Sequence, residues 1–236
     1  MSAQIDNKKQ IFNWLENIQG IGPITAKKIY KLFKTQKIIG PDTTELELRD
    51  LVRNSKDLNL STEALYDLKY NPLKRVEREK VKHFDDLLKS DRLFIGGSYC
   101  RGRKFSGDID ILFNGSMDQF NKLIKEKNIT MTEMISEGPF RNSTYFKLGD
   151  EYIHVDIFLT NDESWIFTKL YVIGSGKFNL LMRSYAKKKN MILNQEYLAK
   201  KDGEKLKKIK CKKEKDIFEK VGMDYKKWED YSSRDI

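Results

Sequence analysis

The sequence has little cysteine and no long apolar run. These two absences exclude several classes of protein. It contains two cysteines, Cys100 and Cys211, which are far apart and form no CxxC pattern. A disulfide framework or a structural zinc site is therefore not expected, and a reducing compartment fits. No stretch approaches the length of a membrane span, and the first ten residues lack the apolar core of a signal peptide. We expect a soluble intracellular protein with no membrane partner, and the sequence does not distinguish nucleus, cytoplasm and virion.

The sequence has no internal repeat. Its positive charge, in contrast, is in excess over its negative charge. Lys and Arg number 45 against 35 Asp and Glu, which gives a formal net charge of +10. Excess positive charge favours polyanionic partners, because each neutralised phosphate releases condensed counterions. A basic soluble protein without such a partner has the same balance, so charge alone is weak support for nucleic-acid binding. The length permits one large domain or two to three small ones.

Residues 1–77 are polar and carry the spacing of helices. Apolar residues from Ile11 to Ile18 form one helical face, and further helices are predicted over residues 25–33, 46–52, 62–68 and 75–88. A glycine turn, Gly20-Ile21-Gly22, joins the first two. This arrangement is typical of a helix-hairpin-helix, whose turn offers backbone groups to a DNA phosphate without reading sequence. A plain helical hairpin with a solvated lysine face is the competing interpretation. We expect a helical DNA-binding domain over residues 1–77, in which the DNA contacts are Gly20, Gly22 and Lys27.

The pattern changes to short strands over residues 78–160. Strands are predicted at residues 93–97, 108–113, 143–147 and 153–159, with a turn at 148–151 and a crossover helix at 117–125. These elements predict an α+β domain with a mixed β-sheet.

Residues 161–236 are expected to form a third domain, also α+β. Helices are predicted over residues 165–172 and 178–189. The lysine-dense stretch 200–215 fits either a nucleic-acid-binding loop or a solvated face, and its domain favours DNA contact.

Three aspartates are the candidate catalytic residues. Asp108 and Asp110 are two residues apart on a predicted strand, so both side chains point to one face. Two adjacent carboxylates repel unless a cation neutralises them, and Mg²⁺ prefers oxygen ligands of this kind. Asp156 lies on a later alternating strand and could supply a third carboxylate. Three convergent carboxylates suit two metal ions, one beside a 3′-hydroxyl and one on a triphosphate. Two solvated aspartates on an edge strand remain the alternative for the pair taken alone.

A predicted phosphate-binding turn precedes the aspartate pair. Gly97 and Ser98 follow a strand and expose backbone N–H groups and a hydroxyl, while Arg101 adds a forked cation. Gly107 lets the backbone approach a ligand closely. The combination of a phosphate cradle and paired metal ligands predicts a metal-dependent nucleotidyltransferase.

With these motifs the sequence resembles the family X, polymerase-beta-like DNA polymerases from about Leu15 onward, most strongly between Gly97 and Asp110. The resemblance implies a nucleotidyltransferase-type palm in residues 78–160 and a nucleotide-selecting domain in 161–236. It implies two Mg²⁺ ions, or Mn²⁺, on the aspartates, with Asp156 also receiving the primer hydroxyl proton. By the same resemblance, the triphosphate-binding residues are Ser98, Arg101, Gly107 and Arg75.

The segment from Tyr171 to Asn179 resembles the family's Tyr-Phe-Thr-Gly-Ser segment. The resemblance implies that Tyr171 packs against the incoming sugar, that the backbone at Gly174 excludes a ribose 2′-hydroxyl, and that Asn179 contacts the base edge. Arg183, one helical turn later, would reach the template strand. In the family the glycine–serine peptide bond is cis, and we predict the same for Gly174-Ser175.

The helical hairpin resembles the family's primer-gripping hairpin, which implies a Na⁺ or K⁺ ion on the carbonyls of Glu16, Ile18 and Ile21. On that alignment the amino-terminal lyase domain is expected to be missing, and a viral or otherwise reduced repair system fits. Lys28 has a position like that of a Schiff-base lysine, but lyase activity is not expected. The expected partners are a dNTP and gapped or primer–template DNA, bound by a monomer.

The sequence also departs from the family, at Cys100, His154, Val172, Ile173 and Gly176. None of these positions is a predicted metal ligand, but they concern sugar and base selection, so we predict a fidelity below that of polymerase beta. The predicted function is gap-filling, template-directed DNA synthesis in repair. The alternatives are a template-independent or RNA-type nucleotidyltransferase on the same palm, and a DNA-end-binding scaffold with an inactive site. The retained aspartates argue against the scaffold.

Overall fold

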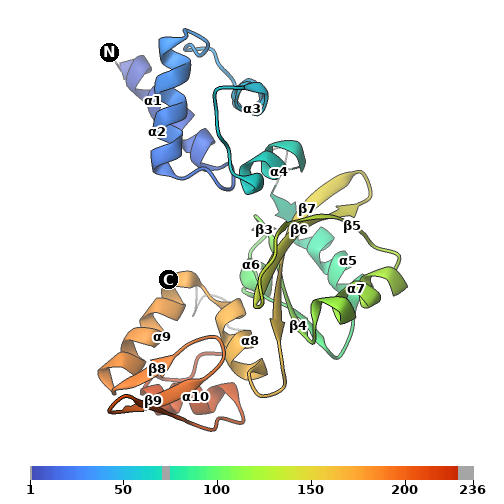
Figure 1. The fold of residues 1–236 in the computed structure, drawn as a ribbon, viewed down its shortest axis with the longest axis vertical. Coiled ribbons are helices and arrows are strands. Elements are labelled where there is room, and N and C mark those ends of the chain that lie inside the picture. Colours follow the sequence, from blue (N-terminus) through green and yellow to red (C-terminus); the bar gives the residue numbers. More distant parts are fainter. Residues whose placement is uncertain (1, 71–74, 228–236) are drawn as a thin grey trace. The chain divides into compact units, whose positions relative to one another are not determined.

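The computed structural model describes the backbone of residues 2–70 and 75–227, and the side chains of residues 8–70 and 75–227. Contacts divide the chain into two units, Met1–Lys74 and Arg75–Ile236, each with its own core (Figure 1). Both helices and strands are present, and the largest sheet is mixed, so the predicted α+β class is confirmed. Within the described residues, no helix is both long and apolar enough to cross a bilayer.

The first unit is helical, as predicted. It contains α1 (Ser2–Glu16), α2 (Pro23–Thr35), α3 (Glu45–Asn54) and α4 (Thr62–Tyr70). Apolar residues at helical spacing, among them Leu15, Ile29 and Leu48, are buried between the helices. The start of α3 is fixed by a capping box: the Thr44 hydroxyl accepts from the Glu47 N–H, and the Glu47 carboxylate accepts from the Thr44 N–H at 2.8 Å.

Removing this cap should loosen the first unit. We expect Thr44→Ala to lower the free energy of unfolding by about 1 kcal/mol, because the first turn of α3 loses a hydrogen-bond acceptor for its free N–H groups. Urea unfolding followed by circular dichroism measures the change. Thr43→Ala, in which the neighbouring hydroxyl accepts from the Gly40 N–H outside any helix, is the control. Equal losses in the two variants would contradict the assigned role of the cap.

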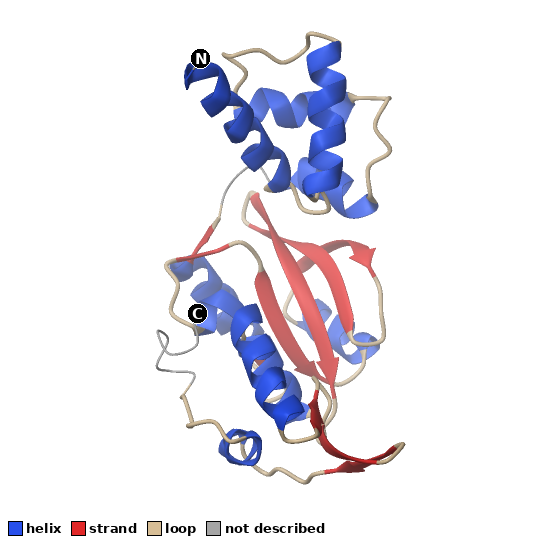
Figure 2. Cartoon of the chain, turned by 90° about the vertical axis from the view of Figure 1, so that its left-hand side faces the viewer, coloured by secondary structure: helices blue, strands red, loops and turns tan. Residues whose placement is uncertain are grey.

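A five-stranded sheet dominates the second unit, and its strands are drawn in red in Figure 2. The strand order is β2-β4-β7-β6-β5. Its strands are β2 (Leu93–Ile95), β4 (Ile109–Asn114), β5 (Thr130–Ser136), β6 (Arg141–Leu148) and β7 (Glu151–Thr160). β4 and β7 pair in parallel, and the other neighbours pair antiparallel. The parallel pair brings the predicted aspartate strands together, because Asp110 lies directly opposite Asp156.

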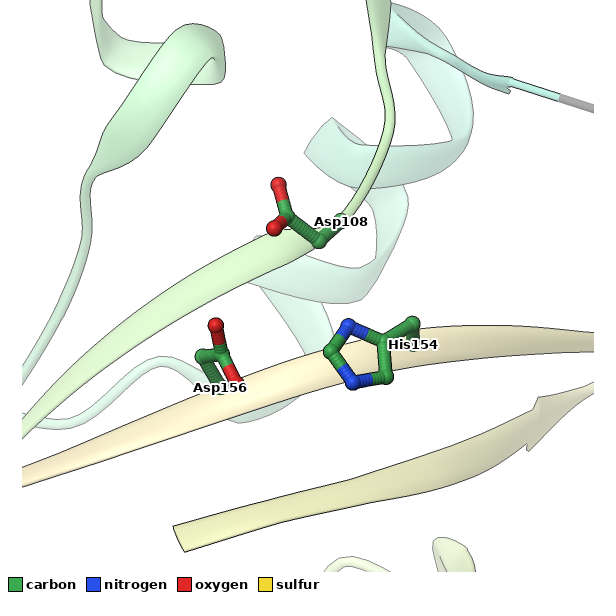
Figure 3. A group of neighbouring side chains, drawn as sticks. All are labelled: Asp108, His154 and Asp156. Atoms are coloured by element: carbon green, nitrogen blue, oxygen red, sulfur yellow. The ribbon is translucent and has the colours of Figure 1, made fainter. Parts of the chain in front are cut away.

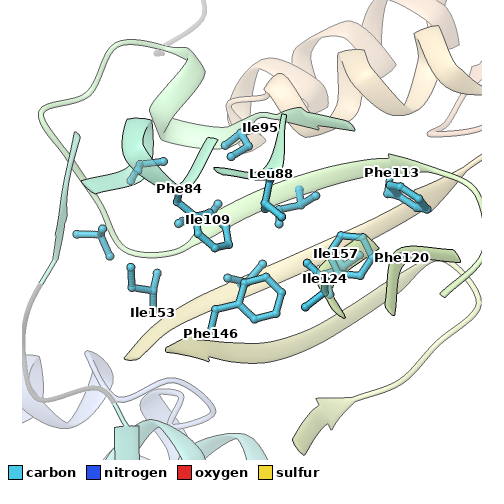
Figure 4. Close-up of a cluster of buried hydrophobic side chains, with 14 residues drawn as sticks. Phe84, Leu88, Ile95, Ile109, Phe113, Phe120, Ile124, Phe146, Ile153 and Ile157 are labelled. Carbon is cyan, nitrogen blue, oxygen red and sulfur yellow. The ribbon is translucent and has the colours of Figure 1, made fainter. Parts of the chain in front are cut away.

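Two helices, α5 (Arg78–Leu88) and α7 (Met117–Glu126), supply apolar side chains to one face of this sheet. Figure 4 shows Phe84 of α5 and Phe120 of α7 gathered with Ile109, Phe146 and Ile157 of the strands. Side chains alternate along a strand, so the residues between these core positions point to the opposite face. The three predicted aspartates lie on that opposite face.

The C-terminal elements follow the sheet. They are α8 (Trp165–Ile173), α9 (Gly176–Lys188), β8 (Met191–Leu193), β9 (Leu198–Asp202), β10 (Lys205–Lys208) and α10 (Glu214–Val221). The three strands form an antiparallel sheet in the order β10-β9-β8. Phe178 of α9 and Phe218 of α10 are fully buried in a core of their own, with ring centroids 6.0 Å apart.

Several local predictions were wrong. The helix predicted from residue 75 begins at Arg78, because Val76 and Glu77 form a short strand, β1, that pairs with β3 (Phe105–Ser106). The turn predicted at Gly97 is a four-residue helix, α6 (Gly97–Cys100). Strand β5 was not predicted, and the lysine-dense stretch holds strands rather than a loop.

Candidate active site

Three carboxylates converge on the face of the mixed sheet opposite α5 and α7. Asp110 on β4 is paired in register with Asp156 on β7, and Asp108 immediately precedes β4. Figure 3 shows Asp108, Asp156 and His154 pointing into the same space. One potential ligand atom from each of these three residues lies within 4.8 Å of the others. This spacing fits a divalent cation with oxygen and nitrogen ligands.

Electrostatics in this group favour a cation. Burial raises the pKa of Asp110 well above its ordinary value, and the neighbouring carboxylates of Asp108 and Asp156 raise it further. Burial followed by repulsion from Asp156 also raises the pKa of Asp108. Both shifts describe carboxylates that are costly to ionise together unless positive charge lies between them. The carboxylate oxygens therefore fit the predicted magnesium ions, whereas the nearby His154 offers a nitrogen, which Mg²⁺ does not favour.

Two residues that sequence reasoning missed hold Asp156 from the adjacent strand. The Arg141 guanidinium donates to Asp156 Oδ2 at 2.6 Å, and the Ser143 hydroxyl donates to Asp156 Oδ1 at 2.5 Å. Both donors lie on β6, whose register places Ser143 opposite Asp156. A signal was available in the sequence: a hairpin closed by the predicted turn at residues 148–151 fixes that register.

The predicted phosphate-binding residues surround α6. Ser98 in this helix donates through its hydroxyl to Ser106 on β3 at 2.9 Å. The β1–β3 register pairs Val76 with Ser106, so its continuation places Arg75 across from Gly107. Arg101 follows α6, and its guanidinium donates to the Ile173 carbonyl at the end of α8, at 2.5 Å. Of these residues, Ser98 and Arg101 line the cavity beside Asp108 and Asp110, whereas Arg75 and Gly107 do not.

Gly97 lies against the carboxylate group. Its φ of +59° is in the left-handed region, and a Cβ built there would lie 2.8 Å from Asp110 Cγ and overlap Oδ2. Only glycine fits this position, because it combines a positive φ with close contact to a buried acid.

A cavity of about 510 Å³ adjoins the carboxylates, and both the palm sheet side and the C-terminal elements line it. Asp108, Asp110, Ser98 and Arg101 come from the sheet side, and the other predicted residues that line it are Tyr171, Gly174, Asn179 and Arg183. A larger cavity, of about 890 Å³, lies in the first unit and holds none of the predicted site residues.

The residues that line the C-terminal side of the 510 Å³ cavity also contact one another. The Asn179 side-chain amide donates to the Tyr171 carbonyl at 2.8 Å, and the Arg183 guanidinium lies over the Tyr171 ring. The Gly174–Ser175 peptide bond is cis, which confirms that prediction. The Ser175 hydroxyl accepts from the Phe178 N–H and caps α9.

The predicted hairpin residues lie in the first unit, between α1 and α2. Gly20 has a φ of +77°, and a Cβ there would lie 2.5 Å from the Ser61 hydroxyl, so the turn packs closely on the start of α4. Ile18 and Ile21 are buried, and the Ile18 carbonyl accepts from the Ile21 N–H at 3.0 Å. Gly22 precedes α2, and Lys27 is exposed on it.

Comparison with known proteins finds similarity to DNA polymerases. A family model for the DNA polymerase beta thumb matches residues 168–230, which include Tyr171, Asn179 and Arg183. DNA polymerase lambda of Arabidopsis thaliana is 27% identical over 149 residues, or 56% of this chain. The chain is related to the family X DNA polymerases. It spans 26% of the length of that relative.

The family X relationship identifies the C-terminal elements, α8 to α10, with a thumb. The three aspartates and the loop at α6 lie outside the residues that the thumb model matches.

Proposed function

We propose that this protein is a template-directed DNA polymerase that fills short gaps in DNA during repair. The observation that carries the proposal is the convergence of Asp108, Asp110 and Asp156 beside a cavity that the α6 loop and the thumb share. Nucleotidyl transfer requires a triphosphate, a primer terminus and a base to be read in one place. The cavity borders groups suited to each of these tasks.

In the proposed reaction the primer 3′-hydroxyl oxygen attacks the α-phosphorus of a dNTP, and pyrophosphate leaves. Asp108, Asp110 and Asp156 would hold two divalent ions, Mg²⁺ or Mn²⁺, which when bound neutralise the phosphates and make the hydroxyl proton easier to lose. Asp156 would receive that proton. Its carboxylate is fixed by Arg141 and Ser143, so its orientation does not depend on the substrate.

The remaining residues would hold the nucleotide. Ser98, Arg101, Gly107 and Arg75 would bind the triphosphate through a hydroxyl, guanidinium groups and backbone N–H groups. Because Arg101 also donates to the Ile173 carbonyl, it ties the triphosphate side of the cavity to the thumb.

Base and sugar selection would fall to the thumb. Tyr171 and the backbone at Gly174 would contact the sugar, Asn179 the base edge, and Arg183 the template strand. Val172 in place of an aromatic residue leaves this selection weaker, and we expect a misincorporation ratio above that of polymerase beta.

The first unit would grip DNA through its helical hairpin. The N–H groups at Gly20 and Gly22 and the ammonium of Lys27 would contact phosphates, and the carbonyls of Glu16, Ile18 and Ile21 would hold Na⁺ or K⁺. We propose the division into residues 1–77, 78–160 and 161–236 as the DNA-binding, palm and nucleotide-selecting domains of a monomer.

Primer extension on a one-nucleotide gap tests the proposed function. The wild-type chain should add the complementary dNTP in the presence of Mg²⁺, and Asp156→Ala should not. Addition without a template would instead support the template-independent alternative. Equal inactivity of both proteins, each folded by circular dichroism, would refute a polymerase function.

Arg141 should matter for turnover rather than for substrate binding. Arg141→Ala removes the ion pair to Asp156, and we expect kcat to fall about 10-fold, because groups that orient metal ligands contribute effects of this size. KM for the dNTP should change little, since Arg141 does not line the 510 Å³ cavity. Arg141→Lys should restore part of the loss. A rise in KM with unchanged kcat would contradict this role.

A further inference from the structure

A surface of exposed lysines lies at one end of the thumb, and two separate segments build it. One is the end of α9, and the other is the β9–β10 hairpin. The Lys201 N–H donates to the Asn190 carbonyl at 3.0 Å, and the Asn190 side chain donates to the Lys201 carbonyl at 3.2 Å, so the two segments are joined. We name this the lysine surface, and it comprises Lys187, Lys188, Lys189, Lys200, Lys201, Lys205, Lys207 and Lys208.

The lysine surface concentrates positive charge. All eight side chains are exposed, and within the part of the chain that the structure describes none of them forms an ion pair. The hairpin itself carries two acids, Asp202 and Glu204, near its tip. Like charges held together repel, and a polyanion bound across them removes that repulsion while releasing its own counterions.

Core packing does not account for the outer part of the hairpin. Leu198 and Ala199 at its base are buried, but every residue from Lys200 to Lys208 is exposed, including Leu206 at 46%. One other role would explain lysines here, because β10 is an edge strand and charged side chains keep edge strands from pairing with other molecules. That role concerns β10. At the end of α9, Lys187 and Lys188 suit the negative end of the helix dipole, and the Lys189 ammonium donates to the Lys220 carbonyl at 3.3 Å. None of these roles neutralises the charge of the surface.

We propose that the lysine surface binds the sugar–phosphate backbone of the DNA substrate outside the nucleotide cavity. The inference rests on the proposed function and adds a contact site to it. Helix α9 connects the two places: Arg183 lines the 510 Å³ cavity, and Lys187 follows four residues later on the same side of the helix, about 6 Å along its axis. A DNA strand that leaves the cavity along α9 reaches the lysine surface next.

Salt dependence of DNA binding tests the proposal directly. Fluorescence anisotropy with a labelled one-nucleotide-gap DNA gives the affinity over a series of KCl concentrations. The test variant replaces four lysines of the hairpin, K200Q/K201Q/K205Q/K207Q. The control K82Q/K122Q/K125Q/K127Q removes the same charge from exposed lysines on and next to α5 and α7, on the opposite face of the palm sheet. Both proteins have the same net charge, so only the position of the removed charge differs.

The expected result is a shallower slope of log affinity against log salt for the hairpin variant, by about 0.9 for each phosphate that is no longer neutralised and hence by up to about 3.6. A second variant, K187Q/K188Q, should reduce the slope by up to about 1.8. If both variants have the same slope as the control, the proposal is wrong. It is also wrong if the hairpin variant aggregates but keeps its slope, because that result is expected when the lysines only protect the edge strand. If the hairpin variant shows the shallower slope but the wild-type chain extends no primer, the polymerase function is refuted and the lysine surface still stands as a DNA-binding site.

Discussion

Asp110→Asn is expected to lower the rate of nucleotide addition by about 1000-fold or more while making the metal-free protein more stable. The rate falls because the amide keeps the shape of the side chain but removes one of the three negative charges that would hold the divalent ions, a loss of at least about 4 kcal/mol of transition-state stabilisation. Single-turnover extension of a gapped DNA measures the rate.

Stability should move in the opposite direction, because the Asp110 carboxylate is destabilising when it is ionised. Its pKa is raised in the folded protein by burial and by Asp108 and Asp156, whereas in the unfolded chain it is near 3.8. The folded state therefore holds the proton more tightly, and this contribution to stability is lost as pH rises from about 4 through the folded pKa. In EDTA, Asp110→Asn should unfold at a higher urea concentration than the wild type, and the difference should grow with pH over this window.

Two controls separate charge from shape in this experiment. Asp118→Asn changes an exposed aspartate on α7, on the opposite face of the sheet, and should alter neither rate nor stability greatly. Excess MgCl₂ should stabilise the wild type and leave Asp110→Asn nearly unchanged, because a ligand of the folded state raises stability by mass action. A variant that loses activity and stability together, with no response to pH, would show that Asp110 is a structural residue.

Gly97→Ala is expected to reduce activity about 100-fold, through the position of the Asp110 carboxylate. The added methyl group would overlap Asp110 Oδ2, so the carboxylate must rotate away from its neighbours. Displacement of a reacting group by about 1 Å costs on the order of 100-fold in rate. Steady-state extension should show the loss in kcat.

Gly149→Ala is a matched control for the backbone effect. Gly149 has a φ of +62°, close to the +59° of Gly97, but a Cβ there meets no atom within 4 Å. Both substitutions therefore introduce similar backbone strain, of order 1 kcal/mol. Only Gly97→Ala should abolish most of the activity. Equal activity in the two variants would show that the close approach of Gly97 to Asp110 does not matter for catalysis.

Local patterns in the sequence predicted most of the fold around the site. The alternation of Asp108, Ile109 and Asp110 predicted which side chains share a face, because a strand has a period of two whatever surrounds it. Helices α2, α3 and α7 were predicted within a few residues of their ends. Strand β5 was missed, since its buried positions do not alternate with exposed ones and its pairing with β6 has register shifts.

Pairing between distant segments was harder to predict than local structure. Val76 and Glu77 continue the pattern of the following helix, but they pair with β3 instead, which no local signal reveals. Arg141 was missed for the same reason: its role depends on the strand beside it and not on its own neighbours in sequence. The lysine surface likewise joins α9 and the hairpin through Asn190, a contact between separate segments.

The parallel pairing of β4 and β7 also determines when the site can form during folding. α7, β5 and β6 all lie between the two strands in the chain, so Asp110 and Asp156 meet only after this long crossover has closed. Contacts of high sequence separation form slowly. Recovery of activity during refolding should therefore lag behind the helical signal, which makes catalysis a kinetic reporter of sheet closure.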